Sequence, residues 1–132
     1  MKSKDFVKLQ KILRLATMDP KGNPHIVPVW YGYSRAKFYV GTNTRTKKAQ
    51  NIRQNSKVSF CIDTGINSPD IFGVMGVGKA RLILDNRRVQ SIAKRILLRY
   101  FRSLRNKSAQ QLLNDTDCII EITPKRLSTW KF

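Results

Sequence analysis

Histidine and acidic residues are scarce in this sequence of 132 residues. There is one histidine, His25, and there are eight Asp or Glu residues in total. A Ser/His/Asp or Cys/His catalytic set needs a histidine beside its nucleophile, and His25 lies in an apolar run that is typical of a strand. The sequence has no HExxH motif and no pair of glutamates. These absences argue against hydrolysis by a triad, by a metal ion or by two carboxylates.

Cysteine is rare as well. Cys61 and Cys118 each lie inside an apolar run, and neither belongs to a CxxC pair. Two thiols and one histidine are too few for a structural zinc site, and two separate cysteines do not form a disulfide framework. We expect both cysteines to be reduced core residues, and we expect no bound metal.

Long hydrophobic runs are also missing. No apolar stretch approaches the roughly 20 residues needed to cross a bilayer, and the first residues lack the apolar centre of a secretory signal. Hydrophobic residues still form 41% of the chain, which argues against disorder. We therefore expect a single cytoplasmic domain that covers residues 1–132 and makes no membrane contact.

Positive charge is what the sequence has in excess. The chain carries 26 Lys or Arg residues, and its formal net charge at pH 7 is +18. Such a charge favours anionic partners, which include phosphates, acidic ligands and nucleic acid.

The first half of the chain predicts one helix followed by strands. Apolar residues from Ser3 to Leu13 have helical spacing. The Asp-Pro-Lys-Gly-Asn turn at 19–23 separates two apolar segments, which predicts a hairpin. A short helix is expected within Arg45 to Asn55 because Ala49 and Ile52 have helical spacing. β-branched and aromatic residues then indicate strands at 13–17, 24–31, 37–42 and 58–63.

The second half predicts a long strand, a long helix and two short strands. Ile71 to Leu84 is strand-like and contains glycines at 73, 76 and 78, which suggest bulges or close backbone approach. Asn86 to Phe101 has the spacing of an amphipathic helix with a basic face. Two strands, Cys118–Thr123 and Leu127–Phe132, are expected to hinge at Pro124. Together these elements predict a small, mainly β barrel of six or seven strands with added helices.

The segment Thr42 to Asn51 is the richest local cluster of polar residues. It leaves a strand through residues that cap helices and enters a helix with cations in the first turn, where the helix dipole disfavours them. A phosphate placed there would accept hydrogen bonds from free N–H groups and threonine hydroxyls, and the cations Arg45, Lys47 and Lys48 would neutralise its charge. The alternative is a solvated basic turn.

A second basic segment extends from Lys79 to Lys107, where Asp85 is the only acidic residue. This pattern is compatible with a nucleic-acid footprint. However, Tyr100 and Phe101 lie on the apolar face of the predicted helix, so no aromatic stacking platform stands among the arginines. The pattern favours a solvated basic face over a nucleic-acid interface.

Four segments together resemble a known family. They are LATMDPKGNPHIVPVWYGY, FYVGTNTRTKKAQNIRQNSKVSFCID, GVMGVGKARLI and ITPKRLSTWKF, and they follow one another from Leu15 to Phe132. In this order they look like the signatures of the FMN-binding split-barrel superfamily that includes pyridoxamine 5′-phosphate oxidase. The resemblance implies a six- to seven-stranded antiparallel split β-barrel with short flanking helices and one longer basic helix. It also implies a homodimer with two cofactors at its interface.

The resemblance assigns cofactor-binding roles by position. The residues expected along the isoalloxazine ring are His25, Ile26, Val27, Pro28, Val29, Trp30, Val40, Gly41 and Thr42. Those expected around the phosphate are Thr46, Lys47 and Lys48, to which the charge argument adds Arg45, and Asn51 is a further predicted cofactor-binding residue. The facing subunit would add Gly73, Val74 and Trp130. In the oxidase a glutamine reaches the flavin where this chain has Gly73, which argues against true pyridoxamine 5′-phosphate oxidase activity.

These features predict an FMN-dependent oxidoreductase with a small-molecule substrate, in which the cofactor ring performs hydride transfer and no residue is a covalent catalyst. A deazaflavin-dependent reductase of the same superfamily is the first alternative. The VSFCID strand, the inserted helix and the TWKF ending resemble that branch, and the deazaflavin coenzyme has an acidic tail that a basic groove would attract. The further alternatives are a flavin carrier without turnover and a nucleic-acid-binding protein.

Overall fold

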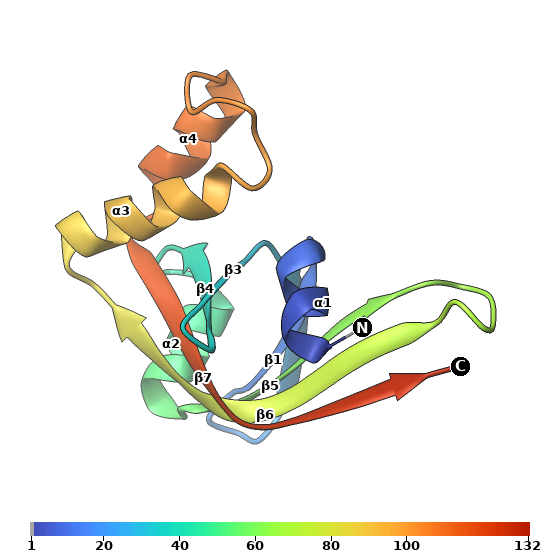
Figure 1. The fold of residues 1–132 in the computed structure, drawn as a ribbon. Coiled ribbons are helices and arrows are strands. Elements are labelled where there is room, and N and C mark those ends of the chain that lie inside the picture. Colours follow the sequence, from blue (N-terminus) through green and yellow to red (C-terminus); the bar gives the residue numbers. More distant parts are fainter. Residues whose placement is uncertain (1) are drawn as a thin grey trace.

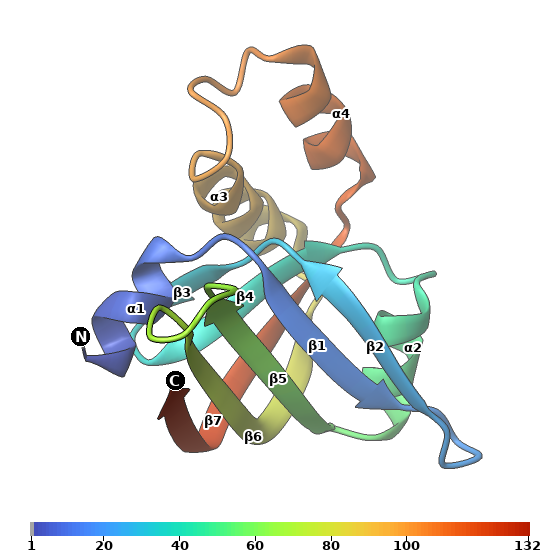
Figure 2. The ribbon, with the colours of Figure 1, turned by 90° about the vertical axis from the view of Figure 1, so that its right-hand side faces the viewer.

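A computed structural model describes residues 2–132 of the chain as one curled antiparallel sheet with helices around it (Figures 1 and 2). The seven strands follow the order β2-β1-β5-β6-β7-β4-β3, so that β2 and β3 form the two edges. The predicted mainly β split barrel is confirmed. The strands are β1 (Leu13–Met18), β2 (Pro24–Val29), β3 (Gly32–Ser34), β4 (Lys37–Thr42), β5 (Lys57–Thr64), β6 (Phe72–Ile83) and β7 (Cys118–Lys131).

Four helices accompany the sheet: α1 (Ser3–Leu9), α2 (Lys47–Gln54), α3 (Asn86–Leu97) and α4 (Lys107–Asp115). Helices α3 and α4 form a pair that stands on the outer side of the barrel (Figure 1). Helix α2 lies at one end of the sheet, and the C-terminal end of β7 lies at the opposite end in both views. Among residues 2–132, no helix is long and apolar enough to span a bilayer.

The predicted hairpin forms between β1 and β2. The carboxylate of Asp19 accepts hydrogen bonds from the backbone N–H groups of Lys21 at 2.9 Å and Asn23 at 2.8 Å. Gly22 supplies the positive φ of the turn, at 84°. An aspartate that binds the backbone two and four residues ahead stabilises such a turn locally. These bonds also lower the pKa of the Asp19 carboxyl.

Two apolar clusters form the core. The first fills the inside of the barrel, where Phe38 packs between Tyr31 and Phe60 at ring-centroid distances of 5.8 and 4.8 Å. The second lies between the outer side of the sheet and the helix pair, and it includes Ile83, Ile119 and the apolar face of α3. The strand pleat explains this division, because successive side chains of one strand point to opposite faces. Cys118 is a buried free thiol whose pKa burial raises to about 11, and Cys61 is a half-buried one.

Several boundaries differ from those that the sequence predicts. The first helix ends at Leu9 rather than Leu13, because the chain turns outward to begin β1 at Leu13. The basic helix ends at Leu97, four residues before its predicted end. The two strands expected around Pro124 form one continuous strand, β7. A register shift between Val77 and Gly78 absorbs the proline, which has no N–H to give to the ladder.

The turn between β3 and β4 contains two strained residues. Arg35 and Ala36 have φ values of 53° and 62°, in the left-handed region. Two-residue hairpin turns of this kind normally use Asn-Gly or Gly-Gly, because a Cβ at positive φ costs about 1–2 kcal/mol per residue. This hairpin therefore holds an arginine in a place that glycine or asparagine fits better.

We predict that Ala36→Gly stabilises the protein by about 0.5–1 kcal/mol, because glycine adopts the observed φ without strain. Urea unfolding followed by circular dichroism measures the change. Ala16→Gly, in the middle of β1, is the matched control and should destabilise by about 0.5–1 kcal/mol. Equal destabilisation by both changes would contradict the strained turn.

Candidate functional site

The connection from β4 to α2 is fixed by threonine hydroxyls. The hydroxyl oxygens of Thr42 and Thr46 are 3.0 Å apart, and the Thr46 hydroxyl accepts from the N–H of Ala49 at 3.4 Å as the helix cap. Within residues 2–132, the N–H groups of Lys47 and Lys48 have no hydrogen-bond partner. The first turn of α2 thus presents free donors at the positive end of a helix, which is an arrangement suited to an anion.

Lys48 extends from this turn into a small pocket. The pocket has a volume of about 200 Å³ and is lined by Trp30, Gly41 and residues of the α3–α4 pair. The ammonium group of Lys48 is half-buried, and burial lowers its pKa below the usual 10.5. Within residues 2–132 this ammonium forms no ion pair and no hydrogen bond. A partly desolvated, unpaired cation is destabilising unless an anion meets it.

The two other predicted phosphate cations point elsewhere. The ammonium of Lys47 lies 3.9 Å from a carboxylate oxygen of Asp19, and its side chain is 56% exposed. Arg45 is exposed, and its backbone N–H donates to the side-chain oxygen of Asn43 at 3.0 Å. Lys48 is therefore the only one of the three cations whose side chain is held in the pocket.

Strand alternation divides the residues expected along the cofactor ring. Val27, Val29 and Val40 pack against the barrel core, whereas Ile26 and Pro28 are exposed on the outer side of β2. Gly41 is exposed on the outer side of β4, where an added Cβ would meet the Thr116 side chain at 3.4 Å. The predicted set includes residues from both faces of these strands. A flat ligand on the outer side of the sheet contacts only every second residue of a strand.

Trp30 is held in place by the end of α3. Its ring stacks on Tyr100 at a centroid distance of 4.1 Å and an interplanar angle of 4°, and it meets Phe101 edge-on at 5.7 Å. Arg99 connects the segment after α3 to the rest of the fold, because its guanidinium donates hydrogen bonds to the backbone oxygens of Tyr31 and Gln10. The indole is thereby fixed at the rim of the Lys48 pocket.

Asn51 and His25 point away from this pocket. Asn51 is buried, and its amide donates to the hydroxyl of Thr17 at 2.9 Å, which ties α2 to β1. His25 pairs with Thr17 in the ladder, and its buried Nδ1 has no hydrogen-bond partner within residues 2–132. Neither side chain lines the Lys48 pocket. Asn51 therefore positions the helix that carries Lys48.

The residues expected from a facing subunit lie at the far end of the sheet. Gly73 and Trp130 are ladder partners on β6 and β7, and a Cβ on Gly73 would lie 2.1 Å from the Trp130 ring. The Trp130 indole thus covers Gly73, and this contact is possible because glycine has no side chain. Val74 is fully buried in the barrel core. Within one chain, these three residues do not reach the Lys48 pocket.

One wall of the pocket was not predicted from the sequence. Leu112 and Thr116 belong to α4 and its C-cap, and both line the Lys48 pocket. A signal for this helix exists, because the Asn106 side chain accepts from the N–H groups of Ser108 at 2.8 Å and Ala109 at 3.2 Å. Asparagine followed by apolar residues at helical spacing is a typical helix start.

Many of the basic residues after Lys79 gather on α3, where Arg87, Arg88 and Arg95 line a second pocket together with Arg35. No group of three or more His, Cys, Asp or Glu side chains that could hold a metal ion occurs within residues 2–132.

Comparison with protein families gives one match over nearly the whole chain. A family model described as pyridoxamine 5′-phosphate oxidase matches residues 2–131. No curated protein sequence matches the chain.

Solved structures share the fold. A conserved hypothetical protein from Mycobacterium tuberculosis superposes with a TM-score of 0.85 at 24% identity, over 99% of this chain and 85% of that chain. A FAD-binding protein from Mesorhizobium loti gives 0.74 at 19% identity, over 98% and 94% of the two chains. The haem storage protein HutZ from Vibrio cholerae gives 0.75 at 16% identity, over 97% and 90%. At these identities the likeness establishes the fold alone.

Proposed function

The chain belongs to the pyridoxamine 5′-phosphate oxidase family, and from this premise we propose that it binds FMN and acts as an FMN-dependent oxidoreductase in the form of a homodimer. The observation that carries the proposal is the half-buried, unpaired ammonium of Lys48, a residue of the same first turn of α2 that has free N–H groups. A terminal phosphate satisfies both, because it accepts hydrogen bonds and neutralises the charge.

The ring system of the cofactor has a matching surface next to this anchor. Trp30, Gly41 and Ile26 lie on the outer side of the sheet, where Trp30 offers an aromatic edge and Gly41 leaves the backbone open to close approach. The pocket of about 200 Å³ is smaller than the roughly 300–1,000 Å³ of typical ligand sites. A single chain thus supplies only one wall, which supports a site completed by a second copy.

Exposed apolar residues supply a surface for that second copy. Met75 and Val77 on β6 are 48% and 36% exposed. Gly73 of β6 and its ladder partner Trp130 of β7 lie on the same face of the sheet as Met75 and Val77. In the proposed dimer this surface faces the ring-binding side of the partner, so that Gly73 and Trp130 close the cofactor site.

The bound flavin would supply hydride transfer to or from a small-molecule substrate. The chain's own residues would bind and orient it: Lys48 and the α2 N–H groups hold the phosphate, and Trp30 limits access of water to the ring. Asn51 and Thr46 keep α2 in place. No side chain is required as a covalent catalyst.

Haem and the deazaflavin coenzyme are the rival cofactors. For haem, the chain offers one histidine as an axial ligand, and His25 does not line the Lys48 pocket. For the deazaflavin coenzyme, the high positive charge of the chain is favourable. Parallel titrations of cofactor-free protein with FMN and with the deazaflavin coenzyme separate the two, and tighter binding of the deazaflavin would replace FMN in the proposal.

We predict that Lys48→Ala weakens FMN binding about tenfold to a hundredfold, which corresponds to the roughly 1.5–3 kcal/mol of a charge-assisted hydrogen bond. Riboflavin, which lacks the phosphate, should bind the variant and the original protein equally. Lys47→Ala is the matched control, because it removes a neighbouring charge that Asp19 already balances. Isothermal titration measures all six affinities. A loss of riboflavin binding as large as that of FMN would place Lys48 away from the phosphate.

The lowered pKa of Lys48 predicts a pH dependence of binding. In the free protein this pKa lies below 10.5, and an adjacent phosphate raises it again, so binding above the lowered pKa requires proton uptake. FMN affinity should therefore be constant below that pKa and fall as the pH rises through it. Lys48→Arg stays protonated and should abolish the fall. Titrations between about pH 7 and 10 test this, and an unchanged profile in Lys48→Arg would contradict it.

We predict that the protein sediments at about twice its chain mass of 15.2 kDa. Met75→Asp places a charge in the proposed interface and should shift the equilibrium to monomer while weakening FMN binding. Leu98→Asp, at an exposed apolar residue beyond α3, is the control and should leave the dimer intact. A monomeric protein that binds FMN tightly would refute the shared site.

A further inference from the structure

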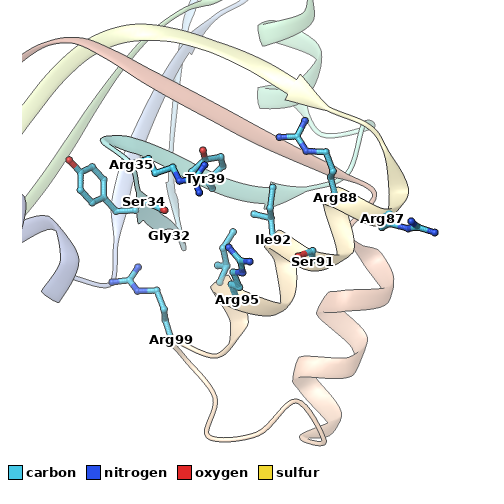
Figure 3. A pocket seen from close by; sticks show the side chains of 12 residues that line it. Gly32, Ser34, Arg35, Tyr39, Arg87, Arg88, Ser91, Ile92, Arg95 and Arg99 are labelled. Carbon is cyan, nitrogen blue, oxygen red and sulfur yellow. The ribbon is translucent and has the colours of Figure 1, made fainter.

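A second and larger pocket lies between α3 and the β3–β4 hairpin (Figure 3). Its volume is about 590 Å³, which is within the range of small-molecule sites. None of the residues that line it is a candidate for flavin binding. Five of them are arginines: Arg35, Arg87, Arg88, Arg95 and Arg99.

Four of these guanidinium groups have no partner. Within residues 2–132, the side chains of Arg35, Arg87, Arg88 and Arg95 form no hydrogen bond and no ion pair. No acidic residue lines the pocket. The guanidinium of the fifth, Arg99, is already engaged, because it donates hydrogen bonds to backbone oxygens. The other four side chains are exposed, so water screens part of their mutual repulsion, and a bound anion would be attracted by all of them.

The carboxylate of Glu121, the ladder partner of Tyr39, is already neutralised. Glu121 is buried on β7, and an oxygen of its carboxylate accepts from Nε of Arg81 at 2.6 Å, with Lys37 at 3.9 Å. Tyr39 lies opposite Glu121 in the ladder and lines the pocket. Burial and the Glu121 charge raise the pKa of the Tyr39 phenol. The phenol therefore stays protonated beside the Glu121 carboxylate.

The arginines occupy positions that their local structure disfavours. Arg87 and Arg88 stand in the first turn of α3, where the helix dipole repels cations. Arg35 has a φ of 53°, a backbone conformation that asparagine and glycine adopt at a lower energetic cost. In Figure 3, Arg95 extends from α3 toward the hairpin that carries Arg35 and Tyr39, whereas Arg87 extends outward at the far end. Arg35 and Arg95 therefore line the pocket from opposite sides, and a shared anionic ligand accounts for this placement.

The pocket also selects the kind of anion. All of its cations are arginines, although lysines are at least as common in the chain. The planar guanidinium fork pairs with two oxygens of one phosphate, which the ammonium group does not. Ile92 and Ile96 add an apolar floor, and Tyr33 and Tyr39 add aromatic faces. We propose that this pocket, the arginine pocket, binds a small molecule with a diphosphate group and an attached ring, of the nucleoside diphosphate class.

ADP is the probe, and adenosine, which lacks the charge, is its control. Titrated into the full chain at moderate salt, ADP should bind once per chain and adenosine should not bind. Arg95→Ala should weaken ADP binding tenfold or more. Lys94→Ala removes the same charge from the same helix, at an exposed residue outside the pocket, and should change the affinity less than twofold. Saturation with FMN should leave ADP able to bind, because the one residue that lines both pockets, Ile96, is apolar and holds neither phosphate.

Arg35→Asn is the second variant, and it separates binding from folding. Asparagine tolerates the positive φ of the turn, so the variant should be at least as stable as the original protein while its affinity for ADP falls severalfold.

Three results would overturn the arginine pocket: no binding of ADP, equal losses in Arg95→Ala and Lys94→Ala, or displacement of ADP by FMN. Binding of single-stranded RNA that both variants weaken equally, in the absence of ADP binding, would assign the arginines to an extended basic surface instead.

Discussion

The outer face of β4 is packed against α3, and the Lys48 pocket and the arginine pocket both depend on this contact. The pleat of β4 points Phe38 and Val40 into the barrel and Tyr39 and Gly41 outward. Helix α3 covers the outward residues only in part. Ile96 of α3 lines both pockets. The arginine pocket opens beside Tyr39, and the Lys48 pocket opens beside Gly41. A shift of α3 along β4 would change both pockets together.

The few acidic residues of the chain form ion pairs with only a small number of its cations. Asp63 pairs with Arg14, Glu121 with Arg81, and Asp19 with Lys47. With 26 basic residues and eight acidic ones, most cations remain without an ion-pair partner. On a convex surface water screens such charges at little cost. In a concavity the solvent is reduced and the charges stand closer, so the cations that matter for binding are those beside the two pockets.

Local sequence signals predicted the parts of the fold that local chemistry determines. Asp19 and Gly22 fix the first hairpin through bonds within five residues, and Thr46 caps α2 in the same way. The short strand β3 pairs locally with β4, but its Arg35-Ala36 turn lacks the Asn-Gly or Gly-Gly signal of a tight hairpin. The continuity of β7 through Pro124 was not predictable, because it depends on pairing with the distant strand β6. The same holds for the site. Lys48 was named from its position in a motif, whereas its neighbours Leu112 and Thr116 come from a helix that meets it only after folding.

In the proposed dimer, cofactor binding and association are coupled. Helix α2, which carries Lys48, lies at one end of the sheet, and the C-terminal end of β7 lies at the other. Gly73 pairs with Trp130 near that second end, so a single chain cannot place Lys48 and Gly73 against one flavin. If the partner supplies Gly73 and Trp130, the cofactor contacts two chains and binds the dimer more tightly than the monomer, and it must therefore favour the dimer by the same factor. The free energy that Lys48 gains from a phosphate would then be measurable as a shift in the monomer–dimer equilibrium.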